Sequence, residues 1–281
     1  MRPLDQQTIL ITGSTDGLGL ELAKRLTNRC ATLVIHGRHP QRLERALTAI
    51  GRSTHRFRVH GVLADLGSLE QVRRLGRDVS KEFDHIDVLV NNAGIAGPHE
   101  RTESADGFEL TFGVNYLSHF LLTRDLLPSL SASGQARIVN VASVGQRRID
   151  FADVMLERDY DWFAAYAQSK LAQITFTFEL ARRLEAAGES GVTANALHPA
   201  TLMDTKMVRK SFGRARSTVS EGVEATLRLV AAPELDGVSG KYFDGLQESA
   251  ADPQAYDAEA RARLWELSEE CCQVEFLPNA G

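Results

Sequence analysis

Short apolar runs alternate along this chain with longer stretches in which apolar residues recur at helical spacing. We interpret the runs as strands, at residues 8–12, 32–36, 57–62, 87–91, 137–142, 192–197 and 241–243. We interpret the periodic stretches as helices, near residues 17–30, 40–50, 68–83, 106–132, 164–188 and 218–231. Strands that are apolar on both faces and alternate with helices are typical of a parallel sheet covered on each side. The pattern therefore predicts an α/β fold with a doubly wound parallel sheet of about seven strands.

No Pro-, Gly- or Ser-rich linker divides the chain, so we expect one domain over residues 1–281, with a core at about 7–245 and a tail at 246–281. Two segments interrupt the strand–helix rhythm: residues 144–163 follow the fifth strand, and residues 198–216 follow the sixth. In open α/β sheets, ligands bind beyond the carboxyl ends of the strands, and long loops there are usually functional. We therefore predict that both segments contact the substrate.

The composition is that of a soluble globular protein, with 43% hydrophobic and 25% charged residues. A net charge of −5 and the lack of a long basic block argue against a nucleic-acid partner. One basic cluster is present in the second of the two segments, at Lys206, Arg209, Lys210, Arg214 and Arg216. It is either a solvated helix face or a contact for an acidic cofactor or substrate.

Cysteine usage and hydropathy bear on the location of the protein. Cys30, Cys271 and Cys272 make neither a disulfide framework nor a metal-ligand spacing, which indicates a reducing compartment and no metal site. The N-terminal sequence enters the first predicted strand almost at once, and no apolar run approaches the ~20 residues of a membrane helix. We expect a cytoplasmic protein without a membrane anchor.

A glycine-rich turn follows the first predicted strand and opens the first helix, with the spacing Gly-x-x-x-Gly-x-Gly. Glycines at such a position allow backbone N–H groups to approach a pyrophosphate at the helix N-terminus. The alternative is a turn that only packs the strand against the helix. The cofactor-binding candidates here are Gly13, Ser14, Thr15, Asp16, Gly17, Leu18 and Gly19.

The end of the second strand bears on the choice of cofactor. A free ribose 2′-hydroxyl is usually held there by Asp or Glu, and a 2′-phosphate by Arg. No acidic residue stands between Glu21 and Glu44, and Arg38 follows Gly37 directly. We therefore predict NADP, with NADPH preferred over NADH, against the alternative of an exposed loop arginine. Asp16 opposes this prediction, because a carboxylate disfavours a doubly charged phosphate.

Three further polar features follow predicted strands or interrupt a helix. The stretch 91–94 ends the fourth strand, where it could line a cofactor groove or form a plain turn. Asn115 interrupts a strongly helical stretch, in which it could bind its own backbone, kink the helix or hold a water molecule. Ser143 ends the fifth strand, where it could bind a substrate oxygen or serve as an ordinary turn residue. The cofactor candidates of the first feature are Asn91, Asn92, Ala93 and Gly94.

Tyr166 and Lys170 lie four residues apart in a periodic stretch, which places both side chains on one face of a helix. An ammonium group beside a phenol favours the phenolate, so we expect the pKa of Tyr166 to lie below its usual value of about 10. A tyrosine of this kind can donate and accept a proton near neutral pH. The pair alone is weak evidence, because Tyr-x-x-x-Lys also occurs on the solvated faces of amphipathic helices.

Taken together, these motifs resemble the short-chain dehydrogenases/reductases, from about residue 7 to about residue 245. The matching positions are residues 12–19, Asp65, residues 91–94, Asn115, Ser143, Tyr166, Lys170 and residues 198–200. The resemblance implies a Rossmann-type fold and NAD(P)-dependent hydride transfer between a carbonyl and an alcohol, as in an alcohol dehydrogenase or carbonyl reductase. The further cofactor contacts that it implies come from Asp65, Leu66, Tyr166, Lys170, Pro199 and Thr201.

The resemblance also implies a role for each catalytic position. Tyr166 is expected to act as general acid/base, and Lys170 to lower its pKa and hold the nicotinamide ribose. Ser143 is expected to orient the carbonyl, and Asn115 to position a water molecule in the proton relay. Hydride chemistry belongs to the nicotinamide, so the protein supplies orientation and a proton.

Residues 171–184 and the tail sequence at 261–270 resemble the retinol-dehydrogenase-like branch of this family. Many relatives there carry membrane anchors, and none is expected in this chain, so the resemblance does not transfer retinoid activity to it. Many relatives also pair through the helices matching 106–132 and 164–188, whereas some of this branch are monomers; a homodimer is therefore possible. Ala200 replaces the glycine usual after His-Pro, which bears on loop geometry but should spare catalysis.

The two segments beyond the sheet bring large apolar residues toward Ser143 and Tyr166, where each could line a pocket or pack as ordinary core. The substrate-binding candidates are Ser143, Phe151, Trp162, Phe163, Leu202, Met203 and Met207, with Phe212 beside them. A mostly apolar pocket with few polar groups predicts a bulky lipophilic or aromatic ketone or aldehyde.

Two alternatives remain. A sugar-nucleotide epimerase or dehydratase of the extended type also uses Tyr-x-x-x-Lys, but those relatives have a different glycine spacing and a larger C-terminal substrate domain. A catalytically silent, NADP-binding sensor is of another class, and such relatives typically lose the tyrosine or the lysine that this chain retains.

Overall fold

The computed structural model describes residues 1–51 and 58–277, and its centre is an eight-stranded sheet in the order β3-β2-β1-β4-β5-β6-β7-β8. The strands are β1 (Thr8–Ile11), β2 (Thr32–Gly37), β3 (Arg58–Leu63), β4 (Val88–Asn91), β5 (Ala136–Val141), β6 (Val192–His198), β7 (Lys241–Asp244) and β8 (Gln247–Glu248). β1 to β7 run parallel, and β8 is antiparallel to β7. The predicted parallel sheet is confirmed; Phe57, expected to begin the third strand, lies outside the described residues. β8 was not predicted, because two exposed residues carry no pattern.

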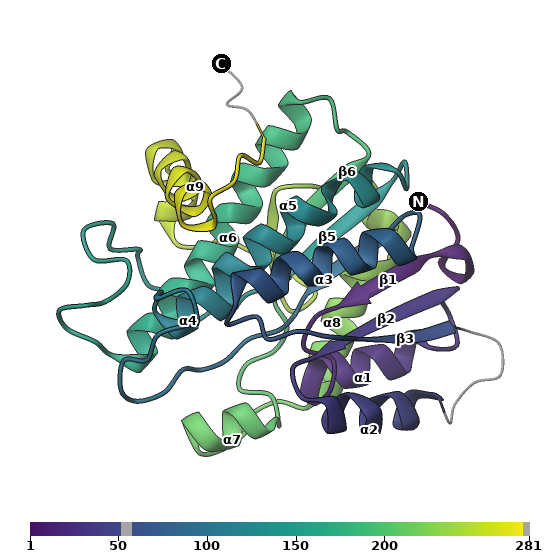
Figure 1. Ribbon diagram of the computed structural model, residues 1–281, viewed down its shortest axis with the longest axis horizontal. Coiled ribbons are helices and arrows are strands. Elements are labelled where there is room, and N and C mark those ends of the chain that lie inside the picture. Colours follow the sequence, from purple (N-terminus) through teal and green to yellow (C-terminus); the bar gives the residue numbers. More distant parts are fainter. Residues whose placement is uncertain (52–57, 278–281) are drawn as a thin grey trace.

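Helices cover both faces of the sheet (Figure 1). One face carries α1 (Gly17–Leu26), α2 (Pro40–Gly51) and α8 (Val219–Ala231), and the other carries α3 (Leu69–Glu82), α5 (Ser118–Ser131) and α6 (Trp162–Ala186). Every residue of β1, β4, β5 and β6 is buried between these layers. This two-sided burial explains the continuous apolar runs in the sequence. Within residues 1–51 and 58–277, no helix has the length and apolar character needed to cross a membrane.

The helix predicted at 106–132 begins later and is irregular. It consists of α4 (Leu110–Phe112), a π-helical turn (Gly113–Leu117) and α5. The buried carboxylate of Glu109 accepts hydrogen bonds from the backbone N–H groups of Thr111 and Phe112, at 2.8 and 2.7 Å, and this cap sets the start of the helix. Asn115 lies within the π-helical turn, so the poor helix former coincides with the irregularity.

Two helices have no counterpart among the predicted elements. α7 (Lys206–Phe212) lies in the segment 198–216, and α9 (Ala258–Cys272) lies in the tail; short 3₁₀ turns occur at Leu4–Gln6, Pro233–Leu235 and Pro253–Tyr256. α9 packs against α6 through Trp265, whose ring centre lies 5.3 Å from that of Phe120 and 5.9 Å from that of Phe176. α9 therefore covers part of the two helices through which a homodimer was expected to form.

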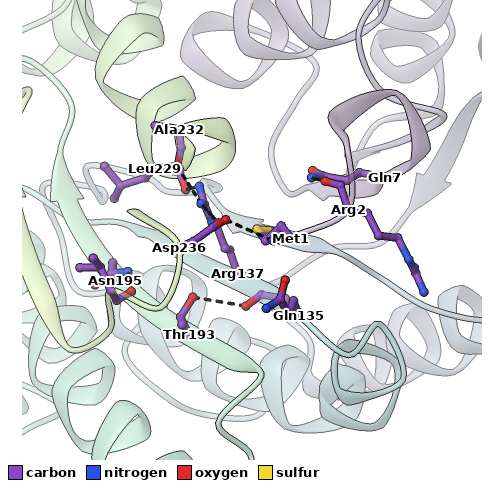
Figure 2. Close-up of polar contacts among 12 residues, drawn as sticks. Met1, Arg2, Gln7, Gln135, Arg137, Thr193, Asn195, Leu229, Ala232 and Asp236 are labelled. Atoms are coloured by element: carbon purple, nitrogen blue, oxygen red, sulfur yellow. Dashed lines mark hydrogen bonds and ion pairs between the residues drawn. The ribbon is translucent and has the colours of Figure 1, made fainter. Parts of the chain in front are cut away.

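Arg137 anchors α8 at the amino end of β5 (Figure 2). Its guanidinium donates to the carbonyl of Leu229 at 3.0 Å and to that of Ala232 at 2.7 Å, and it pairs with the carboxylate of Asp236. The ammonium group of Met1 pairs with the same carboxylate at 3.2 Å. These contacts tie α8 and the N-terminus to the end of the sheet that lies opposite the carboxyl ends of its strands.

Candidate active site

A cavity of about 550 Å³ lies at the carboxyl ends of the strands. Its walls come from the glycine-rich turn, the ends of β2, β4, β5 and β6, part of α6, and side chains between residues 198 and 212. This is where the topology of an open parallel sheet places a ligand. The cavity joins the glycine-rich turn, Arg38, Ser143 and Tyr166 in one continuous space.

The glycine-rich turn packs tightly against the loop that ends β4. A Cβ on Gly13 would lie 2.7 Å from Cα of Ala93, and a Cβ on Gly19 would lie 2.5 Å from Nδ2 of Asn92. The Asn92 amide donates to the carbonyls of Thr12 and Gly13 at 2.8 and 3.0 Å. The close approach of the two loops therefore requires both glycines. Together the loops form one wall of the cavity.

His36, near the end of β2, supports the same turn. Its Nδ1 accepts a hydrogen bond from the N–H of Gly13, and its Nε2 donates to the carbonyl of Ala64, each at 3.0 Å. Burial lowers the pKa of His36 to about 4, so the ring stays neutral and keeps this arrangement at neutral pH. Arg38 and Arg42, both exposed, border the cavity just beyond it and make this part of the wall positively charged.

Asp16, the residue that caps α1, is paired with a lysine of α7. Nζ of Lys206 donates to Oδ2 of Asp16 at 2.7 Å. Burial alone would raise the pKa of Asp16, but the Lys206 ammonium and the N–H of Gly17 hold it below its usual range. The negative charge that opposes NADP in the sequence is therefore compensated by α7. Lys206 thus lies at the cavity, although most of its side chain is exposed.

The side chains of Ser143 and Tyr166 lie next to each other, since a Cβ on Gly145 would lie 3.4 Å from Oγ of Ser143 and 3.8 Å from Cε1 of Tyr166, and both border the cavity. The position of Ser143 is set by its surroundings. Its Oγ accepts from the N–H of Gly145 at 3.0 Å, and its carbonyl accepts from the Tyr242 hydroxyl and the Gln146 amide, each at 3.1 Å. The two hydroxyl groups are therefore presented together, as binding of a single carbonyl oxygen requires.

The pKa of Tyr166 moves in the direction opposite to that predicted. Burial raises it above 10.0, and the neighbouring Ser143 hydroxyl offsets only part of the rise. Lys170 does not reverse this, because its Nζ lies 5.8 Å from the centre of the Tyr166 ring and donates elsewhere. Burial also lowers the pKa of Lys170 to about 7, which weakens its charge at neutral pH. The expected lowering of the Tyr166 pKa is therefore wrong for this structure.

Asn115 binds the loop after β4 and not the backbone of its own helix. Its Oδ1 accepts from the N–H of Ile95 at 2.8 Å, and its Nδ2 donates to the Ile95 carbonyl and to Oγ of Ser169, each at 3.0 Å. It lies behind Gly94, where a Cβ would be 3.4 Å from Oδ1 of Asn115 and 3.5 Å from Nζ of Lys170. Asn115 therefore supports the wall of the cavity without lining it.

We call residues 198–216 the lid, because they close one side of the cavity with apolar side chains. The ring centre of Phe212 lies 6.3 Å from that of Tyr166 and 6.2 Å from that of Phe163. Met203 is fixed beneath α8, since a Cβ on Gly222 would lie 2.2 Å from its sulfur atom. The lid is thus anchored at Met203 and places the aromatic ring of Phe212 next to the Tyr166 phenol.

The lid contains one residue in the left-handed backbone region. Leu202 has a φ of +49°, whereas Ala200 is not among the described residues with positive φ. An alanine therefore fits the position after His-Pro without backbone strain, and the strained residue of the loop is Leu202.

Two cofactor candidates do not line the cavity. Oγ of Ser14 donates to the carbonyl of Ile11 at 2.8 Å, and Nδ2 of Asn91 donates to Oδ1 of Asn140 at 2.8 Å, so both are directed into the buried scaffold. The candidates that do line it are Gly13, Thr15, Asp16, Gly17, Leu18, Gly19, Arg38, Asp65, Leu66, Asn92, Ala93, Gly94, Tyr166, Lys170, Pro199 and Thr201.

The substrate candidates divide in the same way. Those that line the cavity are Ser143, Phe163, Leu202, Met203 and Met207, together with Phe212. Trp162 is not among the lining residues; its ring packs against Phe163 and Phe212, with centres 5.8 and 5.5 Å apart. Phe151 packs toward α9, where the guanidinium of Arg263 lies 4.9 Å from its ring centre.

Two basic residues of the cavity are missing from the sequence-based candidates. Arg42 could have been found from the sequence, because the first turn of a helix that starts at Pro40 lies next to the strand end that carries Arg38. For Lys206 the sequence offered only its membership of the basic cluster, because Asp16, with which it pairs, is distant in the sequence. Their positions complete the charged part of the cavity.

Comparison with known proteins agrees with this geometry. The family model for short chain dehydrogenases matches residues 7–215. Retinol dehydrogenase 13 from Mus musculus is 41% identical over 277 residues, covering 92% of this chain and 81% of that protein. Retinol dehydrogenase 12 from Homo sapiens is 36% identical over 285 residues, covering 97% and 88%. The crystal structure of an uncharacterized protein from Mycobacterium paratuberculosis matches with a TM-score of 0.81 at 33% identity, covering 98% of this chain and 97% of that one. The chain therefore belongs to the short-chain dehydrogenase family of oxidoreductases and is similar to its retinol dehydrogenases.

Proposed function

We propose that this protein interconverts a ketone or aldehyde and the corresponding alcohol by NADP(H)-dependent hydride transfer, with Tyr166 as general acid/base. The observation that carries the proposal is the continuous cavity that includes the glycine-rich turn, Arg38, Ser143 and Tyr166. Membership of the family supports a carbonyl/alcohol oxidoreductase that uses NAD(P). The choice of NADP, the role of each residue and the class of substrate are the parts that we propose.

The donor groups around the cavity suit NADP. The N-terminus of α1 borders it at Gly17 and Leu18, and a helix N-terminus favours a pyrophosphate. Arg38 and Arg42 offer guanidinium groups that suit a ribose 2′-phosphate. Tyr166 and Lys170 border the part of the cavity where we place the nicotinamide ribose. When bound there, the nicotinamide supplies or accepts the hydride.

Ser143 and Tyr166 bind and protonate the substrate oxygen. Their side chains lie next to each other at the cavity, so a carbonyl oxygen placed between their hydroxyl groups receives a hydrogen bond from each and is polarised. As negative charge develops on that oxygen, Tyr166 transfers its phenolic proton to it; in the oxidation the phenolate takes the proton back. Because burial raises its pKa, Tyr166 holds the proton at neutral pH and is ready to act as an acid.

Lys170 and Asn115 support this step. The Tyr166 phenolate left after proton transfer is an anion in a buried site, and the Lys170 ammonium is the cation on the same helix face. Asn115 holds the loop after β4 through Ile95, which keeps Gly94 against the cavity. The water molecule expected beside Asn115 stays a prediction.

The lining of the cavity supports a lipophilic or aromatic substrate. Phe163 and Phe212 contribute apolar surface next to Tyr166, and Met207 lines the same cavity, whereas Ser143 and Tyr166 are the polar groups at the reacting oxygen. The relatives named retinol dehydrogenases point to the same class of substrate. A cytoplasmic location and a homodimer stay predictions.

Consumption of NADPH in the presence of a panel of ketones and aldehydes tests the proposal. Net oxidation of NADPH, with formation of the alcohol, is the expected result, and it should be larger for lipophilic carbonyls than for small polar ones. Tight NADPH binding without turnover on any carbonyl would favour the sensor. Interconversion of a nucleotide sugar without net consumption of cofactor would favour the epimerase or dehydratase.

A further inference from the structure

The ammonium group of Lys170 is held by two oxygen atoms of the scaffold. Its Nζ donates to the carbonyl of Val141, the last residue of β5, at 2.9 Å, and to Oε1 of Gln173 at 2.8 Å. Lys170 is buried and borders the cavity. An ammonium group has three N–H donors, so these two bonds leave one donor for the cavity. The direction of that donor is set by Val141 and Gln173.

The orientation of the Gln173 side chain is in turn set by His119 of α5. Nε2 of Gln173 lies 3.0 Å from Nδ1 of His119, and both side chains are buried. Since Oε1 of Gln173 faces the Lys170 ammonium, its NH₂ group must be the donor to Nδ1. His119 must therefore be neutral, with its proton on Nε2. Burial lowers the pKa of His119 to about 3, so this state persists over the working range of pH.

We propose that Gln173 and His119 are positioning residues for Lys170: they hold its Nζ in place and keep it protonated next to Tyr166. The proposal rests on the proposed function only for the statement that Lys170 takes part in carbonyl chemistry. Gln173 is the side-chain acceptor of the ammonium, and His119 prevents the amide from rotating to present its NH₂ group to a cation.

None of the ionisable groups described as facing Lys170 carries a negative charge near pH 7, so Gln173 is the main side chain that stabilises its ammonium group. They are Tyr166 on the same helix, His119 on α5 and His198 at the end of β6. Burial lowers the pKa of both histidines and raises that of Tyr166, so all three are neutral near pH 7. Burial also lowers the pKa of Lys170 to about 7, and the acceptor oxygen of Gln173 opposes this desolvation.

An NMR titration of the lysine side chains tests the proposal directly. The chain has six lysines, so lysine labelling gives few signals, and Lys170→Met assigns the one of interest. Gln173→Leu removes the acceptor and should move the Lys170 midpoint down by about one pH unit or more. Gln173→Glu has nearly the same size but adds a negative charge, so it should move the midpoint up. His119→Leu frees the Gln173 amide and should give a smaller downward movement.

Gln168→Leu is the matched control. Gln168 lies on the same helix and is equally buried, but its amide donates to the carbonyl of Val154 at 2.9 Å and accepts from the N–H of Asp150 at 3.0 Å. This variant should leave the Lys170 midpoint unchanged. If Gln173→Leu does not fold, His119→Leu still decides, because it keeps the Gln173 oxygen but frees its amide, and a purely structural role for Gln173 predicts no movement of the Lys170 midpoint.

The titration separates this proposal from the proposed function, because it needs neither cofactor nor turnover. With a carbonyl substrate, the alkaline limb of kcat/KM for reduction should move in the same direction as the midpoint in each variant. Movements of the midpoint without turnover in any variant would overturn the proposed function and leave the positioning role standing. An unchanged midpoint in both Gln173 variants, or movement of both in the same direction, would overturn the positioning role.

Discussion

The two sides of the cavity are built in different ways. We call Ser143, Tyr166 and Lys170 the floor; Ser143 follows the end of β5, and Tyr166 and Lys170 lie on α6. Oγ of Ser143 accepts from the N–H of Gly145, and Nζ of Lys170 donates to the carbonyl of Val141, so both are held by the scaffold. The lid, residues 198–216, is attached in part by an exposed ion pair between Lys206 and Asp16, in which the Lys206 side chain is 86% exposed. Loss of a partner for a buried polar group costs about 1–3 kcal/mol, whereas an exposed ion pair contributes about 0–1 kcal/mol.

This difference separates two tasks. The floor must present the phenol and the ammonium with the same geometry in every turnover, and buried hydrogen bonds supply that constancy. The lid must admit cofactor and substrate, and weak contacts allow it to do so at small cost. We therefore expect changes in the floor to alter the rate of the chemical step, and changes in the lid to alter which ligands bind.

Tyr166→Phe is the most severe test of the floor. The ring and its packing remain while the proton donor is lost, so turnover should fall by about 10²–10⁴. NADPH affinity should stay within a few-fold of the parent value, and single-turnover rates with a binding titration measure both quantities. Tyr160→Phe is the control, because the Tyr160 hydroxyl donates to the carbonyl of Pro98 at 3.0 Å and does not border the cavity. A Tyr166→Phe variant with most of its activity would remove the phenol from the mechanism.

Arg38→Ala tests the choice of cofactor at a residue that borders the cavity but belongs to neither the floor nor the lid. Loss of a charge-assisted contact with a 2′-phosphate costs roughly 1.5–3 kcal/mol, so NADPH should bind about 10- to 150-fold more weakly. NADH, which lacks this phosphate, should bind almost as before. Arg45→Ala, an exposed arginine further along α2 that does not line the cavity, should change neither. Equal kcat/KM for NADPH and NADH in the parent enzyme would contradict the assignment.

The sheet and the floor were predictable because their signals are local. Burial on both faces makes each strand a continuous apolar run, and Tyr166 and Lys170 show their common helix face through spacing alone. α7 and α9 give no such signal. Val208 is the buried apolar residue of α7, and Trp265 of α9 packs on Phe120 and Phe176, which are distant in the sequence.

The differences between sequence and structure at the site also have physical causes. The sign of the Tyr166 pKa shift depends on burial and on the distance to the Lys170 ammonium, and spacing along a helix reports neither. Ser14 and Asn91 belong to motifs whose other members line the cavity, but alternate residues of a strand end or turn face inward. Only the three-dimensional arrangement shows which residues these are.

Phe212→Ala tests whether the lid selects substrates. Full burial of such a ring is worth about 1.5–3 kcal/mol, and the partial contact here should reduce kcat/KM for bulky aromatic carbonyls by roughly 10-fold. Small carbonyls that do not reach Phe212 should be little affected, so the ratio of the two kcat/KM values is the measurement. Phe151→Ala removes the same type of ring from the other segment, where it packs toward α9, and should leave the ratio unchanged. Equal losses for large and small carbonyls would count against a selective lid.

The smallest expected effect concerns the ion pair between the lid and the glycine-rich turn. Lys206→Ala removes the cation that pairs with the Asp16 carboxylate. The carboxylate, which also interacts with Arg42, then repels the extra phosphate of NADPH, so NADPH should bind a few-fold more weakly and NADH less so. Asp16→Asn should bind NADPH at least as well as the parent, and adding Lys206→Ala to it should cost little. Arg209→Ala is the control, because Arg209 pairs with Asp204 on the same lid and neither lines the cavity. Equal losses from Lys206→Ala with and without Asp16 would mean that Lys206 acts on the cofactor directly, and the weak attachment of the lid would then have no part in the choice of cofactor.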